Sequence, residues 1–252
     1  MKQKPPFTVC YQDTCIIVVN KASGIAVSAD RWDDAKERLD TLLVPLVGKV
    51  FTVHRIDRDT SGLVVFTLDG ETHKRLSQAF EEHLVQKSYI AVVHGRPSWK
   101  ETGCDLPLVP DGDKQHRTII DKCRGKPSVT QFRLLGTAGT YSVVEALPET
   151  GRTHQIRVHL TSLGHPVVCD PLYGTIKPVF LSSFKRGWRG DPLQERPLLS
   201  RLGLHAARLV LPGYPPAMAD NLTLNAPLPR DMAALINQME KSAGTSLLSI
   251  II

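Results

Sequence analysis

The sequence lacks any long uninterrupted apolar stretch. A helix that spans a membrane needs about 20 consecutive apolar residues, and a secretory signal needs an apolar core of about 7–15 residues near its start. The apolar segment at residues 247–252 is too short to span a membrane, and is interpreted as a docked end strand or an exposed tail. We therefore expect a cytoplasmic protein that makes no contact with a membrane.

Cysteine is sparse and scattered, which excludes two kinds of scaffold. The five cysteines are odd in number, and no two of them form a Cys-x-x-Cys pair. Structural zinc sites and disulfide frameworks both need cysteines that can pair at regular spacing. We expect reduced, buried thiols instead. The cysteines are Cys10, Cys15, Cys104, Cys123 and Cys169.

Histidine at metal-ligand spacing is absent as well. His54, His154, His159 and His165 invite a metal interpretation, but no two histidines are separated by three residues. That spacing would place two ligands on one helix face, and no carboxylate stands at ligand spacing either. We therefore expect neither a metal ion nor a cofactor.

Acidic residues are fewer than basic residues, by 25 to 31, which gives a net charge of +6. A modest basic excess is compatible with a polyanionic partner but does not establish one. The apolar fraction of 42% is too high for a disordered chain, so a folded core is expected. Only a site can identify the partner.

Short apolar runs alternate with polar loops and predict both strands and helices. Strands are expected at residues 15–19, 51–53, 63–66, 87–93, 129–135, 141–147, 204–211 and 222–224. Helices are expected at 33–43, 70–84, 154–163 and 232–239, a hairpin excursion or long loop at 96–127, and an irregular insert at 174–203. Because strict βαβ alternation is missing, we expect an α+β protein: one domain over residues 1–252, with a largely antiparallel mixed sheet flanked by helices and loops.

The loop at residues 54–62 has the densest cluster of chemically active side chains. It reads HRIDRDTSG and lies between two apolar strands, with adjacent opposite charges and a glycine that permits a tight turn. Loops held between strands are where catalytic groups commonly lie. A salt-bridged surface loop is the alternative that the residues alone leave open.

A second cluster, GRTHQIRVHL, occupies residues 151–160. On a helix, His154, Arg157 and Val158 would share one face, and Ile156 and Leu160 another. A helix that begins at this turn can direct a guanidinium toward a cleft, and its first N–H groups favour an anion. A surface helix with solvated arginines is the alternative.

These segments resemble those of the RluA-type RNA pseudouridine synthases, which modify ribosomal and transfer RNA. The loop at 54–62 is similar to the signature loop of that family, VNKASG at 19–24 to its first motif, and KSYIAVVHG at 87–95 to its tyrosine strand. GKP at 125–127, the cluster at 151–160, GHP at 164–166, DPLYG at 170–174 and LHA at 204–206 follow in the family's order. The resemblance covers about residues 15–210 and implies the pseudouridine synthase fold.

The resemblance implies a role for four residues. Asp57 corresponds to the catalytic aspartate, and Tyr89 to the active-site tyrosine that stacks on the target base. Arg157 corresponds to the basic residue that pairs with the carboxylate, and Arg55 to an arginine that enters the RNA where the uridine leaves the stack. Further RNA contacts are expected from Lys21, Arg58, Lys126, Arg152 and His154, although Lys21 and Lys126 can equally be solvated lysines.

The expected partner is a structured stem-loop of rRNA or tRNA, bound by a monomer. No separate N-terminal RNA-binding module is expected, because the first motif begins near residue 15. The pattern departs from the family at Cys169, where glycine is usual before Asp170, and mildly at Ala22 and Ile56. Two other functions are alternatives: an RNA-binding assembly factor with secondary catalysis, and a glycosidase-like hydrolase using Asp57 and Asp59. The hydrolase is disfavoured because carboxylates two residues apart in a loop point in different directions.

Overall fold

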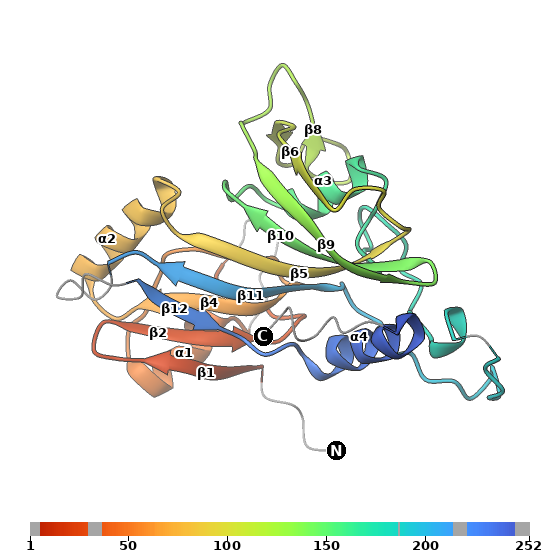
Figure 1. Cartoon of the computed structure of the whole chain (residues 1–252). Helices are drawn as coiled ribbons and strands as arrows, with labels where there is room; N and C mark the ends of the chain where they lie inside the picture. Colours follow the sequence, from red (N-terminus) through yellow and green to blue (C-terminus); the bar gives the residue numbers. More distant parts are fainter. Residues whose placement is uncertain (1–5, 30–36, 186, 214–220, 245–252) are drawn as a thin grey trace. The chain divides into compact units, whose positions relative to one another are not determined.

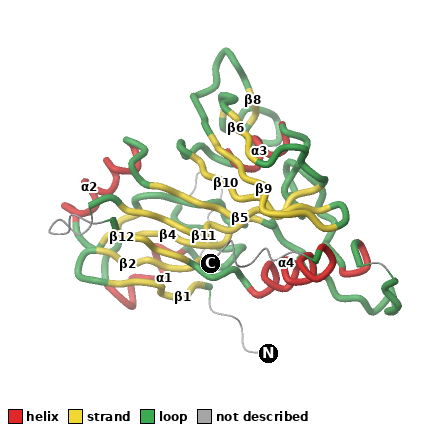
Figure 2. The backbone as a smooth tube through the Cα atoms, in the orientation of Figure 1, coloured by secondary structure: helices red, strands yellow, loops and turns green. Residues whose placement is uncertain are grey.

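The structure is a computed structural model that describes all residues except 1–5, 30–36, 186, 214–220 and 245–252. The predicted tail at 247–252 lies outside the described residues. The described part contains twelve strands, four α-helices and one 3-10 turn (Figure 2). The chain divides into two compact units, residues 1–87 with 206–227 and residues 88–205 with 228–252. That the whole chain works as one catalytic domain stays a prediction.

The first unit is built on an antiparallel sheet (Figure 1). The strand order within it is β1 (Phe7–Gln12), β2 (Ile16–Lys21), β4 (Ser61–Thr67) and β11 (Leu204–Leu211), of which residues 206–211 belong to this unit. β3 (Phe51–Thr52) pairs with β4, and β12 (Leu222–Asn225) pairs with β11. Consecutive strands therefore bring the two ends of the 54–62 loop back to one sheet.

Alternating side chains of these strands build the core of the first unit. Ile16 and Val18 on β2 and Leu63 and Val65 on β4 lie in one apolar cluster. This cluster also takes in Leu76 of helix α2 (Gly70–Glu81). The intervening residues of β2 and β4 are fully buried too, so both faces of this sheet are covered. This explains why these strands read as continuous apolar runs rather than as alternating patterns.

Helix α2 begins where the sequence predicts a turn. The carboxylate of Asp69 accepts a hydrogen bond from the Thr72 N–H at 2.8 Å, a side-chain N-cap. Helix α1 (Leu39–Val47) begins later than the helix predicted at residues 33–43 and ends beyond it. Part of the predicted span, residues 33–36, lies outside the described residues.

The second unit is a twisted antiparallel sheet with an excursion from one strand. Its order is β5 (Gln86–His94), β10 (Tyr141–Pro148), β9 (Thr130–Ala138) and β6 (Glu101–Cys104). A two-stranded ribbon, β7 (Leu108–Val109) and β8 (Ile119–Ile120), follows β6. Figure 1 shows the segment with β6 and β8 beside α3 (Gln155–Ser162). The hairpin form predicted for residues 96–127 is therefore confirmed.

Helix α3 is packed into the core of the second unit. Ile156 and Leu160 share an apolar cluster with Ala91 of β5 and with Phe132 and Val144 of the neighbouring strands. Every residue from 155 to 160 is buried, including polar ones. The alternative of a surface helix with solvated arginines is therefore wrong, because Arg157 and its neighbours on the helix are buried. Helix α4 (Arg230–Ala243) closes the unit and is longer than predicted.

The predicted fold class is confirmed: strands and helices mix without strict alternation, and the strand pairs are antiparallel at β1–β2, β2–β4, β3–β4, β5–β10, β9–β10, β6–β9, β7–β8 and β11–β12. Strand β1 was not predicted. The five cysteines are free, but only Cys104 and Cys169 are buried, whereas Cys10 and Cys123 are exposed, so the expectation of buried thiols is only partly correct. No helix among the described residues is long and apolar enough to cross a membrane.

Candidate active site

Asp57 lies in a tight turn between β3 and β4. The Thr60 N–H donates to the Asp57 carbonyl at 3.1 Å, which closes the turn. The Asp57 side chain is partly buried, and the neighbouring Arg55 and Arg58 are exposed. The turn thus presents a carboxylate between two exposed guanidinium-bearing residues.

A buried lysine from the first motif holds this turn. Lys21 is 0% exposed, and its ammonium donates to the carbonyls of Ala22 at 2.9 Å, Ile25 at 2.8 Å and Arg58 at 2.7 Å. An ammonium has three N–H donors, so these three carbonyls match its capacity. The prediction that Lys21 contacts RNA phosphate is therefore corrected: its buried Nζ positions the turn.

Gly24 and Ser23 of the first motif make three further bonds to the same turn. The Gly24 N–H donates to the Arg58 carbonyl at 2.9 Å, and Nε of Arg58 donates to the Gly24 carbonyl at 3.0 Å. The Ser23 hydroxyl donates to the Asp59 carbonyl at 2.6 Å. The sequence indicated this motif but not that it forms a cradle for the turn that contains Asp57.

His54 fixes the entry to the loop as a neutral imidazole. Its Nε2 accepts the Val65 N–H at 3.0 Å, and its ring stacks on Phe80 with centroids 4.5 Å apart. Burial, assisted by the positive charge of Lys87, lowers the pKa of His54 from 6.5 to about 3. His54 is therefore uncharged near neutral pH. This agrees with its hydrogen bond, because Nε2 can accept the Val65 N–H only when that nitrogen carries no proton.

Gly62 ends the loop with a conformation that other residues rarely adopt. Its φ is +119°, and a Cβ there would overlap the backbone of Ala206. Only glycine meets both demands, the positive φ and the close approach of a neighbouring strand. The close approach to Ala206 therefore fixes the start of β4, directly after the loop that contains Asp57.

In the second unit, Tyr89 lies on β5 opposite Ala146 of β10. Its ring is half-buried and packs against the apolar cluster that contains Ile156 of α3. The exposed remainder of a ring fixed in this way can offer a flat face to a base.

Arg157 forms a buried, bidentate ion pair with Asp170. Its Nε donates to Oδ2 and its Nη2 to Oδ1, both at 2.8 Å, and the two side chains are 3% and 0% exposed. Asp170 also accepts the N–H groups of Leu172 at 2.9 Å and Tyr173 at 3.2 Å. Burial alone would raise the pKa of Asp170, but the hydrogen bonds and charge of Arg157 outweigh it and hold the pKa below its usual range.

Sequence reasoning matched the segment that contains Asp170 but gave this residue no role. The available signal was an acidic residue directly before Pro171 in a turn-forming segment. The preceding Cys169 has a φ of +55°, in the left-handed region, which accounts for the glycine usual there in the family. The unusual cysteine keeps the turn: its buried thiol donates to the Lys177 carbonyl at 3.4 Å, and burial raises its pKa to about 11.

The other predicted RNA contacts lie at the surface or near it. Lys126 is exposed, and Arg152 is half-buried with its Nε donating to the Pro127 carbonyl at 3.2 Å. Nδ1 of His154 lies 2.9 Å from the Tyr173 hydroxyl. The predicted residues therefore fall into two sets, with Asp57, Arg55 and Lys21 in the first unit and Tyr89 and Arg157 among those in the second.

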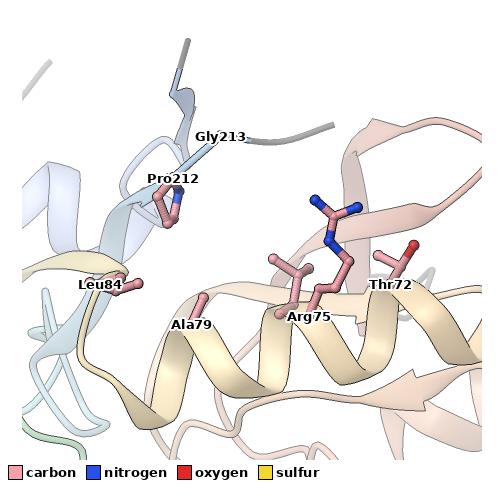
Figure 3. Close-up of a pocket in the computed structure, with 7 residues that line it drawn as sticks. Thr72, Arg75, Ala79, Leu84, Pro212 and Gly213 are labelled. Atoms are coloured by element: carbon pink, nitrogen blue, oxygen red, sulfur yellow. The ribbon is translucent and has the colours of Figure 1, made fainter. Parts of the chain in front are cut away.

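A cavity of about 280 Å³ in the first unit does not coincide with any predicted residue. Thr72, Arg75 and Ala79 of α2 line one side of it, and Pro212 and Gly213 the other (Figure 3). None of the titratable groups described above lines this cavity, so the chemistry is not assigned to it. Within the described ranges, no group of three or more His, Cys, Asp or Glu could hold a metal ion.

Comparison with known proteins identifies the family. The family model for RNA pseudouridylate synthase matches residues 15–162, which include the loop with Asp57, the strand with Tyr89 and the helix with Arg157. The chain belongs to the RNA pseudouridylate synthases. These enzymes are isomerases, so the predicted enzyme class is confirmed.

Two curated relatives show the extent of the likeness. The chain is 32% identical over 248 residues to the ribosomal large subunit pseudouridine synthase D of Zymomonas mobilis, covering 94% of this chain and 74% of the relative. It is also 32% identical over 226 residues to the dual-specificity RNA pseudouridine synthase RluA of Escherichia coli K12, covering 89% and 94%. The likeness therefore extends well beyond single motifs.

Solved structures agree on the pseudouridine synthase fold. The human RNA pseudouridylate synthase domain containing 1 superposes with a TM-score of 0.68 at 25% identity, covering 91% of this chain and 87% of that one. The human RNA pseudouridylate synthase domain containing 4 has a TM-score of 0.69 at 23% identity and covers 92% of both chains. The second of these shows the fold alone.

Proposed function

We propose that this pseudouridine synthase isomerises specific uridines in a structured rRNA or tRNA, with Asp57 as the catalytic carboxylate. The carrying observation is the family match over residues 15–162, within which the turn of Asp57 is held by buried Lys21. The relatives' names include enzymes of the large ribosomal subunit, of dual specificity and of tRNA. These names support the RNA class and leave the modified position to experiment.

The reaction asks for a carboxylate and no redox partner. The glycosidic bond between C1′ and N1 of the uridine breaks, uracil turns, and a new bond forms between C1′ and C5. The proton on C5 leaves, and one proton returns to N1, so atoms balance without an energy donor. Asp57 serves either as nucleophile or as base at the sugar.

Three other residues are assigned to the same uridine. Arg157 is assigned the role of the basic residue that pairs with the catalytic carboxylate, for which a planar guanidinium that is always charged is suited. Tyr89 stacks on the extruded base, which returns about 1–3 kcal/mol against an unstacking cost of a few kcal/mol. Arg55, which is exposed, fills the space that the uridine vacates.

The remaining contacts to RNA are assigned to the surface. Arg58, Lys126, Arg152 and His154 approach phosphates or sugars, and the segments 96–127 and 174–203 select the RNA. The excursion supports this assignment because it exposes Lys114 and Lys122 in addition to Lys126. We also assign the chain a cytoplasmic location and activity as a metal-free monomer with both units in one catalytic domain. Light scattering measures the molar mass and so tests whether the protein is a monomer. Activity in excess chelator tests whether it works without a metal ion.

Asp57→Asn tests the assignment directly. On RNA labelled with tritium at C5 of uridine, the wild type is expected to release tritium and the variant to fall by more than about 1,000-fold, since removing a group that forms bonds to the substrate removes the pathway. RNA binding, measured at several salt concentrations, should persist and weaken steeply with salt in both proteins.

Asp59→Asn is the matched control, because it removes a second carboxylate from the same turn. It is expected to keep most of the activity, since Asp59 is held through its backbone carbonyl by Ser23. Wild-type turnover by the Asp57 variant would refute the role of Asp57. Rescue of a deletion phenotype by that variant would favour an assembly factor over an enzyme.

A further inference from the structure

Tyr173 joins three elements of the second unit. Its hydroxyl accepts the Thr118 N–H at 2.8 Å and lies 2.9 Å from Nδ1 of His154, the residue before α3. Its ring lies under Arg157, with the guanidinium carbon 5.1 Å from the ring centroid. One side chain thus contacts the excursion, the start of α3 and the arginine of the proposed site.

The ring and the hydroxyl of Tyr173 do different work. A guanidinium over an aromatic face is attracted to the ring's negative π-face, and the attraction grows when both groups are desolvated. Arg157 is 3% exposed. Its guanidinium is held by the Tyr173 ring and by the Asp170 carboxylate, and these two contacts form the seat of Arg157. The hydroxyl instead accepts a hydrogen bond from a backbone N–H of another segment and so holds that segment in place.

That other segment is residues 105–127, the part of the excursion at 96–127 that follows β6 and contains β7 and β8. Thr118 precedes β8 and is 2% exposed. A second bond joins the excursion to the same turn, from Nη1 of Arg117 to the Leu172 carbonyl at 3.3 Å. Arg117 is itself held by Asp113, with Nε 2.7 Å from Oδ2. The excursion is therefore fastened to the turn that also holds Arg157.

We propose that Tyr173 is a positioning residue that couples the excursion to the guanidinium of Arg157. This inference rests on the proposed function. RNA bound to the exposed lysines of the excursion would shift the excursion and, through Tyr173, the turn that orients Arg157. The ring sets the orientation of Arg157 and so affects the chemical step. The hydroxyl sets the position of the excursion and so affects RNA binding.

Two substitutions separate these effects, assayed with the RNA that the wild type modifies. Tyr173→Phe keeps the ring and removes the hydroxyl, so KM is expected to rise about 3–10-fold with kcat nearly unchanged. Tyr173→Leu removes both, so kcat is expected to fall by a further factor of about 10 or more. These are order-of-magnitude expectations for a hydrogen bond and a cation–π contact. Equal changes in both variants, or a fall in kcat in Tyr173→Phe, would overturn the proposal.

A matched control is Tyr141→Phe, which removes a hydroxyl from a second tyrosine of the same unit, one that is buried and packs on Phe184. It should change neither parameter. A double-mutant cycle combines Tyr173→Phe with Lys122→Ala. If the hydroxyl acts through the excursion, the two effects on KM are non-additive, and simple additivity would contradict the coupling.

Hydrogen–deuterium exchange gives a readout that does not depend on catalysis. Amides of residues 116–120 are expected to exchange at least several-fold faster in Tyr173→Phe than in the wild type or Tyr141→Phe, because the Thr118 N–H loses its acceptor. Unchanged exchange would refute the fastening. If the wild type modifies no RNA, the proposed function fails by itself, whereas an active wild type with indistinguishable Tyr173 variants refutes only this inference.

Discussion

The turn of Asp57 and the seat of Arg157 are held by opposite means. In the turn, a buried ammonium from Lys21 and a hydroxyl from Ser23 bind backbone carbonyls of residues 58 and 59. At Arg157, the side chain itself is gripped by a carboxylate and an aromatic ring. The first arrangement fixes a piece of backbone, and the second fixes a functional group.

This difference matches what each residue must do. The bonds from the cradle engage the backbone carbonyls of residues 58 and 59, so they set the place of the turn that contains Asp57. A guanidinium has five N–H donors in a rigid plane, so a bidentate partner can orient it while leaving part of the plane outside that pair. We expect that breaking the pair of Arg157 with Asp170 leaves a buried charge less compensated. Breaking the cradle should instead make the loop that contains Asp57 less ordered.

Asp170→Asn is expected to have the largest effect on stability, because it removes the carboxylate that makes the buried bidentate pair with Arg157. Breaking a buried ion pair in this way costs about 3–5 kcal/mol, measured as the free energy of unfolding in urea. Turnover per folded molecule should also fall, since Arg157 loses its orientation. The stabilisation from Asp170 is present above the ordinary pKa of an aspartate and is lost as pH falls through its lowered folded pKa.

Asp231→Asn is the matched control for Asp170. Asp231 also forms a bidentate pair, with Arg201 at 2.7 Å for both bonds, but the two side chains are 39% and 20% exposed. Exposed pairs contribute about 0–1 kcal/mol. A loss of the same size in both variants would show that burial does not distinguish them.

Lys21→Met is expected to have the next largest effect. It keeps the length of the buried stem but removes the donor to the carbonyls of Ala22 and Ile25, and an unsatisfied buried acceptor costs about 1–3 kcal/mol. The free energy of unfolding should fall by roughly 2 kcal/mol, and turnover should fall further because the Asp57 turn loosens. Lys74→Met, at an exposed position of α2, controls for loss of one charge.

The same variant tests the corrected role of Lys21 in RNA binding. If Lys21 only positions the turn, the slope of log affinity against log salt stays as in the wild type. A slope reduced by about 1, together with unchanged stability, would restore the phosphate contact that the sequence predicted.

His54→Gln is expected to have the smallest effect at neutral pH and to change the acid limb of stability. The unfolded chain takes up a proton near pH 6.5, whereas folded His54 does so only near pH 3. Stability is therefore full above pH 6.5 and falls as pH drops toward 3, by up to about 1.4 kcal/mol per pH unit. Urea titrations between pH 4 and 7 should show a shallower slope in the variant, and the same slope as wild type in His83→Gln, an exposed position. An unchanged slope in His54→Gln would show that His54 is not buried in its neutral form.

Local patterns predicted most strands and the 54–62 loop, because continuous β-branched runs and turn residues act over a few positions. They failed at α3, where the spacing of Ile156 and Leu160 indicated one buried face although all of residues 155–160 are buried. What covers the other face comes from segments far along the chain. Asp170 was overlooked as a partner for the same reason, since thirteen positions separate it from Arg157.

The sequence by itself determined the family, the order of motifs and the identity of the proposed catalytic carboxylate, because these depend on residue types at fixed spacing. Only the tertiary structure decided that Lys21 lies buried beneath the turn of Asp57. It alone also decided that Asp170 and Tyr173 seat Arg157. The physical reason is the same in both cases: a buried charge needs partners that folding brings from distant segments, and no local pattern records which they are.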